Sequence, residues 1–410
     1  MPSPAVPSGS RGIVTLVGAL AAIYLVSQFL RNSVGVIAPD LASEIGLSAG
    51  EIGLLSSAFF FAFAAAQLPL GVAIDRYGPK RCMLVCAAIA FLGTLQFATA
   101  TTPAGLITAR VLMGLGSSCY LMAPLALYAR RFPPERFTVL AGIQLAIGTV
   151  GTLFVTAPLA WASATIGWRA TFVVVAGLMV ACAVWVAVGV REDGKDRVHP
   201  GSAETARETL NGMLEVVRMR AFLPLFLMQA VTYSSYVLII GLWGGPFLTH
   251  VYGYGLTTRG ELLMLPAISH IVGVVVWGHA QRIVGAYKAL VLSGALATAA
   301  ALGVLAAAGR LEPAALVVWL ALFGFLPAYI PVLIGHGRSL LPPHLIGRGM
   351  TLLNIGTMGG TFVVQLVSGA LIDLFPAHNG AYPLDAYRLV FAVQALGILA
   401  ACATYVAVRR

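Results

Sequence analysis

Charged residues are scarce in this sequence, and their scarcity excludes most soluble folds. Only 10% of the 410 residues are Asp, Glu, Lys or Arg, and 59% are hydrophobic, whereas a soluble domain has roughly a quarter of its residues charged. A membrane-spanning helix needs about 20 apolar residues, because the hydrocarbon core is ~30 Å thick and each residue rises ~1.5 Å. The chain therefore has room for about twelve spans.

Cysteine is also scarce, which bears on metal and redox chemistry. The five cysteines lie in apolar stretches without metal-ligand spacing, so we predict no metal site and no cofactor.

The net charge of +10 does not indicate a nucleic-acid partner, because Lys and Arg sit in short gaps between apolar runs. No nucleophile elbow or carboxylate pair occurs, so we expect the chain not to be an enzyme.

Apolar runs bounded by charge, Pro or Gly predict an all-α membrane protein. These runs cover 13–38, 49–73, 82–101, 104–128, 138–161, 168–190, 222–249, 261–281, 287–308, 313–335, 349–374 and 388–408. A polar segment separates the sixth run from the seventh. We therefore predict one six-helix bundle over 1–190, a cytoplasmic linker over 191–221 and a second six-helix bundle over 222–410. The first run is too long for a signal-peptide core and should stay as a span.

Positive charge is distributed unevenly between the predicted loops. With both termini in the cytoplasm, 19 of the 25 Lys and Arg residues fall inside. The exceptions are four residues outside and two within spans: Arg169, Arg259, Arg310 and Arg388, then Arg31 and Arg110. The positive-inside rule therefore predicts cytoplasmic termini and a multi-pass protein of the bacterial inner membrane.

The two predicted bundles resemble each other in sequence. Segment 46–52 is echoed by 255–262, and segment 147–152 by 355–361, in both cases at an offset of about half the chain. Small-residue packing patterns can recur by chance, but two matches in the same order make chance the weaker account. We expect two pseudo-symmetric bundles that rock around a site near the membrane midplane.

A glycine-rich charged turn follows the second apolar run. It reads Gly71-Val-Ala-Ile-Asp75-Arg76-Tyr-Gly78-Pro-Lys-Arg81. Its glycines permit a tight turn and close helix approach, and Asp75 with the basic residues can form a charge lock that breaks when the bundles rock. A structural turn without gating is the plainer interpretation, and both can hold together.

This turn closely resembles motif A of the major facilitator superfamily. The segment 110–116 is similar to motif B of that family, and 278–288 is similar to a second copy of motif A with Gln281 in place of the acid. The resemblance implies the twelve-span superfamily fold and transport of a small solute by alternating access. It also implies that Gly71, Asp75, Arg76, Gly78 and Arg81 act as gating residues, and that spans 1, 4, 7 and 10 line the central path.

Two arginines lie inside predicted spans, where an unpaired charge costs several kcal/mol. Arg31 is about 12 Å inside one end of span 1, and Arg110 is about 10 Å inside span 4. Tyr24, Ser27 and Gln28 share the helical face of Arg31 and should look at water or substrate. A structural role for both arginines, paired with carbonyls, is the alternative, and for Arg110 we favour it.

Further polar residues in spans complete the candidate site. Candidate ligands for substrate are Arg31, Tyr24, Gln28, Arg110, Gln229, Tyr233, Tyr236 and Asn354. Asn354 and its repeat partner Gln144 can equally join helices. No acidic residue sits clearly mid-membrane, so His270 or His336 is the candidate proton relay if protons drive the carrier. A histidine in a span is more often a packing residue.

The residues around Arg31 point to an anionic substrate. The segment 24–31, followed by Ala38 and Pro39, is similar to the first span of the organophosphate and organic-anion branches of the superfamily. In those branches the matching arginine clamps a phosphate or carboxylate, which suits guanidinium geometry. We expect uptake of a small organic anion by a monomer in the lipid bilayer, coupled to protons or to exchange.

Other functions stay open at this point. Import of a vitamin such as riboflavin is one, because Tyr233, Tyr236, Trp243 and Trp277 can stack on a flat ring. Import of a trace metal such as copper is disfavoured, because Met residues in spans 7 and 8 lack partners spaced four apart. Drug efflux ranks lower, because span 5 matches an antiporter motif only loosely. A non-transporting sensor on the same fold is the candidate from another class.

Overall fold

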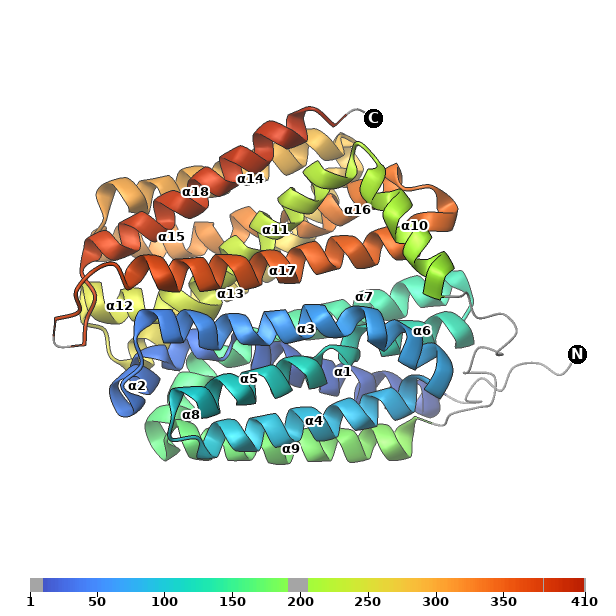
Figure 1. Ribbon diagram of the computed structural model, residues 1–410, viewed down its shortest axis with the longest axis horizontal. Coiled ribbons are helices and arrows are strands. Elements are labelled where there is room, and N and C mark those ends of the chain that lie inside the picture. The colour runs from blue at the N-terminus through green and yellow to red at the C-terminus, as the bar shows by residue number, and fades with distance from the viewer. Residues whose placement is uncertain (1–9, 191–205, 379, 409–410) are drawn as a thin grey trace, which may run out of the picture.

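The structure, a computed structural model, describes residues 10–190, 206–378 and 380–408 and is built from helices (Figure 1). Within these residues 12 helical spans are long and apolar enough to cross a membrane, as predicted. Seven spans are single helices: α3 (Ala49–Tyr77), α4 (Pro79–Thr99), α9 (Trp168–Gly189), α13 (Leu256–Val284), α14 (Tyr287–Ala308), α17 (Ile346–Ile372) and α18 (Leu384–Val406).

The other five spans are interrupted. Span 1 consists of α1 (Ser10–Asn32) and α2 (Val34–Ile45), and span 4 of α5 (Pro103–Ser117) and α6 (Cys119–Arg131). Span 5 consists of α7 (Pro134–Gly151), η1 (Leu153–Val155) and α8 (Ala157–Ile166). Span 7 consists of α11 (Phe222–Leu238), η3 (Ile239–Trp243) and α12 (Gly244–Tyr252), and span 10 of α15 (Pro313–Phe325), η4 (Leu326–Tyr329) and α16 (Ile330–Leu340). Spans 1, 4, 7 and 10 are the ones that the family resemblance places along the central path.

Polar side chains stabilise the break in span 1. The Ser33 hydroxyl donates to the Leu30 carbonyl at 3.1 Å, and the Asn32 side chain donates to the Gln28 carbonyl at 3.3 Å. Side chains that take up helix carbonyls in this way compete with the backbone ladder and bend helices. In span 7 the interruption is a single π-helical turn, a feature frequent at functional sites.

The helices form two groups that meet along α3 and α17. Figure 1 shows the helices of the first half of the chain below those of the second half, with α3 and α17 side by side at the junction. The predicted linker 191–221 lies outside the described residues up to position 205 and then forms α10 (Ala206–Arg218). The start of α1 and the end of α18 lie at the same end of the molecule, which we call the termini end.

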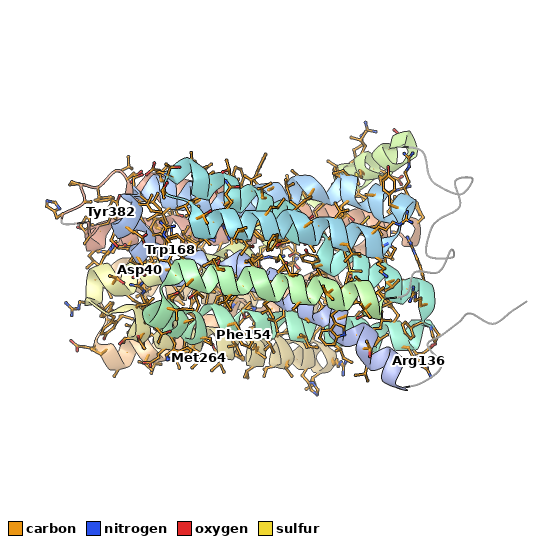
Figure 2. The ribbon with its side chains drawn as sticks, turned by 90° about the horizontal axis from the view of Figure 1, so that it is seen from below. Asp40, Arg136, Phe154, Trp168, Met264 and Tyr382 are labelled. Atoms are coloured by element: carbon orange, nitrogen blue, oxygen red, sulfur yellow. The ribbon has the colours of Figure 1, made fainter. Side chains whose placement is uncertain are left out.

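The opposite end, which we call the far end, is the periplasmic end in the predicted topology. Figure 2 shows Asp40 and Tyr382 at the far end and Arg136 at the termini end. Large apolar side chains are exposed around the helices, for example Val188 at 77% and Trp161 at 66%. Such a surface suits lipid and not water.

Candidate functional site

Arg31 lies in the last turn of α1, where span 1 breaks. The residue is only 6% exposed. Its Nη1 donates to the Tyr233 hydroxyl of α11 at 3.4 Å, and its Cζ lies 4.7 Å from the centroid of the Phe63 ring of α3. Its Nε has no hydrogen-bond partner within the described part of the chain. The guanidinium therefore joins the two halves of the protein and keeps a donor for a further acceptor.

Arg110 of α5 is fully buried and faces backbone carbonyls. Nη1 donates to the Leu30 carbonyl at 2.5 Å, Nη2 to the Arg31 carbonyl at 3.2 Å, and Nε to the Leu55 carbonyl at 3.3 Å. The ring of Phe59 lies 4.7 Å from its Cζ. Arg110 thus holds the broken end of α1 against α3, the geometry that we favoured over substrate binding.

Tyr24 and Gln28 lie on the same face of α1 as Arg31 and pack against α7. A Cβ at Gly148 would come within 1.9 Å of the Tyr24 ring, and one at Gly151 within 3.0 Å of the Gln28 Cβ. The two glycines therefore make room for these side chains. The Gln28 Oε1 is buried and has no partner among the described residues.

The second half of the chain contributes two tyrosines and a histidine to the same region. Tyr236 lies one turn after Tyr233 on α11, and its ring stacks on His270 of α13 with centroids 4.0 Å apart and planes 18° apart. The Tyr236 hydroxyl lies near Thr152 and makes no hydrogen bond that the described structure shows. The His270 Nδ1 faces the Gly324 carbonyl at 3.0 Å and so carries the proton, which leaves Nε2 as the basic nitrogen.

The remaining candidates do not join Arg31. Gln229 accepts a hydrogen bond from the Thr357 hydroxyl at 3.3 Å, so it links α11 to α17. Asn354 lies on α17 one turn before Thr357 and is partly buried. His336 contacts the Tyr405 hydroxyl through Nδ1 at 2.5 Å and stacks on the Tyr287 ring. Gln144 donates to the Leu20 carbonyl at 3.0 Å and joins helices.

The charged turn after α3 contains an ion pair at the termini end. Asp75 accepts a hydrogen bond from Arg130 of α6 at 2.5 Å, and the Arg76 Cζ lies 5.4 Å from the Tyr77 ring centroid. Gly78 has a φ of 88° and ends α3, as a tight turn requires. The close helix approach expected at Gly71 is absent here, because a Cβ at that position would meet no atom within 4 Å.

Arg259 joins the two halves at the far end, and α13 begins at Leu256, before the start predicted at 261. The arginine lies in the first turn of α13, is 3% exposed, and pairs with Asp40 of α2. Its Nε donates to the Val36 carbonyl at 2.7 Å and its Nη1 to the Thr249 hydroxyl at 3.0 Å. A single guanidinium therefore connects α2, α12 and α13 across the two halves.

Glycines allow α2 and span 7 to touch at the same end. A Cβ at Gly35 would come within 2.3 Å of the Ile240 carbonyl oxygen, and one at Gly245 within 2.0 Å of the Gly35 carbonyl oxygen. The backbones of the two halves are thus in direct contact. In this structure the path is closed at the far end.

Comparison with known proteins identifies the family. The family model of the Major Facilitator Superfamily matches residues 20–334. The chain belongs to this superfamily. Its architecture agrees, because the chain resembles the solved structure of a bacterial homologue of the human lysosomal transporter Spinster with a TM-score of 0.81, at 18% identity over 97% of each chain. We conclude that the protein is a multi-pass membrane transporter of the Major Facilitator Superfamily.

Some curated relatives are named as transporters of small acids, and others, such as the chloramphenicol resistance protein of Streptomyces lividans at 27% identity, are named for drug resistance. The chain is 23% identical to the probable sulfoacetate transporter of Cupriavidus necator, over 63% of this chain and 62% of that protein. It is 22% identical to the D-galactonate transporter of Escherichia coli, over 96% of this chain and 97% of that protein. The match to the sulfoacetate transporter therefore spans less than two thirds of that relative, and the match to the D-galactonate transporter spans nearly all of it.

Proposed function

We propose that this superfamily member imports a small organic anion by alternating access, with Arg31 as the clamp for its carboxylate, sulfonate or phosphate group. One observation carries the proposal: Arg31 is a buried guanidinium in the middle of span 1 with an unpartnered Nε and only a neutral tyrosine hydroxyl on Nη1. Guanidinium groups bind such anions through parallel N–H donors. A membrane interior tolerates this cation when a partner compensates it.

The neighbours of Arg31 suit the rest of a small polar acid. Tyr24, Gln28, Tyr233 and Tyr236 supply hydroxyl and amide groups from both halves, and the Oε1 of Gln28 and the hydroxyl of Tyr236 are unpartnered within the described residues. Unsatisfied buried polar atoms are costly, so a ligand that pairs with them gains affinity. We propose Thr152 as an additional member of this set, because it lies beside Tyr236.

The names of the relatives support the same substrate class. Sulfoacetate and D-galactonate are small acids, ionised at neutral pH, and the match to the D-galactonate transporter covers 96% of this chain. We propose that the present protein acts as a monomer in the bacterial inner membrane, with both termini in the cytoplasm and uptake from the far end. Gln229, Asn354 and His336 stay predictions for substrate or proton binding.

Import of riboflavin is less well supported by the geometry. Of the four aromatic residues considered for a flat ring, Trp243 donates its indole N–H to Ser368 at 2.7 Å, and Trp277 donates to the Phe325 carbonyl at 3.1 Å. Both indoles are therefore engaged in joining helices. Of these four residues Tyr233 contacts Arg31, and Tyr236 follows it one turn later on α11.

A thermal-shift screen of the purified protein tests the proposed class. The panel contains sulfoacetate, D-galactonate, glycerol 3-phosphate and riboflavin, because a ligand that binds the folded state raises its apparent stability. We expect stabilisation by at least one of the acids, its loss in Arg31→Lys, and its retention in Arg282→Lys, which changes an exposed arginine of α13. Stabilisation by riboflavin alone, or equal stabilisation of Arg31→Lys, would refute the anion clamp.

A further inference from the structure

The charge of Arg31 has no carboxylate beside it. Within the described residues its contacts are the Tyr233 hydroxyl and the Phe63 ring. The described carboxylates that take part in hydrogen bonds or ion pairs lie at the two ends of the molecule: Asp40 with Arg259, Glu44 with Arg169, Glu51 with Ser48, Asp75 with Arg130, Glu215 with His344, Asp373 with Gly50, and Asp385 with Arg388. The site is therefore cationic when it is empty.

The titratable groups that face Arg31 cannot neutralise it. Tyr24, Tyr233 and Tyr236, on α1 and α11, carry phenol groups, which supply no carboxylate to the site. His270, stacked on Tyr236, gains positive charge when it binds a proton and would add to the charge of the site. Arg110, the next cation, is held by three backbone carbonyls, which solvate its charge without cancelling it.

With this arrangement the bound substrate anion is the counter-ion of the Arg31 guanidinium. During alternating access the protein passes through a state closed at both ends, in which Arg31 loses its remaining contact with water. With an anion bound, the guanidinium crosses that state as a compensated pair, whereas in the empty carrier it crosses uncompensated, which is strongly unfavourable. The loaded carrier should thus reorient much faster than the empty one.

We propose that the protein is an obligatory anion exchanger, in which a second small anion must bind on the cytoplasmic side before the carrier returns. The inference rests on the proposed function and specifies its coupling: one anion enters as another leaves, and no proton is carried. In each half-cycle the two bundles rock around Arg31 while an anion is bound to it, so charge compensation at Arg31 limits the rate in both directions.

Uptake into proteoliposomes tests the exchange. The vesicles hold the purified protein and contain either unlabelled D-galactonate or a sucrose medium buffered with Tris, whose counter-ion is a polyglutamate too large to be carried, and labelled D-galactonate is added outside. The same pair of vesicles is prepared with sulfoacetate on both sides. We expect initial uptake into anion-loaded vesicles to exceed uptake into unloaded vesicles by about tenfold or more, the factor that ~1.4 kcal/mol of extra barrier produces.

A substitution at Gln28 tests the same idea by placing a counter-ion for Arg31 inside the protein. Gln28 lies one turn before Arg31 on the same face, with its Oε1 buried and unpartnered in the described structure, so Gln28→Glu puts a carboxylate within reach of the guanidinium at nearly constant volume. We expect weaker anion binding and a ratio of loaded to unloaded uptake that falls toward one. The control is Gln96→Glu, because Gln96 contacts Gly105 and Thr108 of α5 and not Arg31.

The outcomes separate the two proposals. Equal uptake into loaded and unloaded vesicles would overturn obligatory exchange and leave anion import standing. Failure of both acids to enter loaded vesicles, together with no thermal stabilisation by any acid, would overturn anion import itself. An unchanged uptake ratio in Gln28→Glu, with measurable exchange, would show that the charge of Arg31 does not limit the return of the empty carrier.

Discussion

The Asp373 carboxylate accepts a hydrogen bond from the Gly50 backbone N–H at 2.7 Å, and this contact ties the end of α17 to the start of α3. The Ser48 hydroxyl and the Tyr382 hydroxyl donate to the same carboxylate at 3.2 and 3.1 Å, and the Tyr382 oxygen accepts from the Ala49 N–H. Burial raises the pKa of Tyr382, so its hydroxyl stays a donor at neutral pH. The acid thus sits at the positive end of α3 and holds the two halves together at the far end.

Asp373→Asn should weaken far-end closure, because the amide keeps the shape and loses the charge that favours a helix N-terminus. The effect on the closed state should be about 0.5–1 kcal/mol, or roughly two- to fivefold in its population. The measurement is labelling of Val36→Cys by a membrane-impermeant maleimide from the far-end side, since Val36 is fully buried in the closed contact. We expect faster labelling of Cys at position 36 when Asp373→Asn is combined with Val36→Cys than when Val36→Cys is present alone.

Asp385→Asn is the matched control for that experiment. Asp385 also lies at a helix start near the far end, but its partner Arg388 is on the same helix, α18, at 3.0 Å. Removing this acid breaks no bond between the halves. Equal acceleration of labelling in both variants would mean that Asp373 has no special role in closure.

Gly245→Ala should also disfavour the far-end-closed state, by steric means. Its new Cβ would lie 2.0 Å from the Gly35 carbonyl oxygen. Neither atom can rotate away, because the oxygen is part of the backbone and the Cβ is bonded to it. Overpacking of this kind costs about 1–3 kcal/mol, so the carrier should shift toward far-end-open states and transport should slow. Spin labels on α2 and α12 report the separation, and Gly177→Ala is the control because its Cβ would meet no atom within 4 Å. An unchanged distance distribution in Gly245→Ala would contradict the tight contact.

Much of the architecture could be predicted from the sequence, because hydrophobic length and charge bias are local signals. The 12 spans follow from apolar runs, and the common end of both termini follows from an even number of crossings. The polar face of α1 with Tyr24, Gln28 and Arg31 follows from helical period; in the structure Arg31 contacts Tyr233, and Tyr24 and Gln28 pack against α7.

The breaks within spans could not be predicted, because distant partners stabilise them. The apolar run continues through Ser33, and the carbonyl of Leu30 is freed from the helix ladder only where Arg110, 80 residues later, supplies a donor. Phe63 under Arg31 is one of several phenylalanines in its run, and nothing local marks it. Arg259 and Asp373 lie at span ends, where charge is ordinary, and their roles depend on the opposite half of the chain.

Arg110→Lys should destabilise the protein even in the absence of any ligand. The ammonium of lysine cannot reach the carbonyls of Leu30, Arg31 and Leu55 together, so buried charge-assisted hydrogen bonds are lost. We expect a loss of roughly 2–4 kcal/mol in the free energy of unfolding. Thermal unfolding in detergent measures it, with Arg282→Lys as the exposed control. If Arg110→Lys melts like the parent protein but loses stabilisation by anions, Arg110 is a substrate ligand and not a structural anchor.

Transport should be indifferent to a proton gradient, because no described carboxylate contacts Arg31 and a protonated His270 would add positive charge to the site. Uptake of labelled D-galactonate into anion-loaded vesicles should be equal with and without an inwardly directed proton gradient. His270→Gln should keep this indifference while weakening anion affinity a few-fold, since it alters the ring that stacks on Tyr236. His279→Gln, which changes an exposed histidine of α13, should change neither property and serves as the control. Accumulation that requires the gradient and disappears in His270→Gln would instead establish His270 as a proton relay and remove exchange as the coupling mechanism.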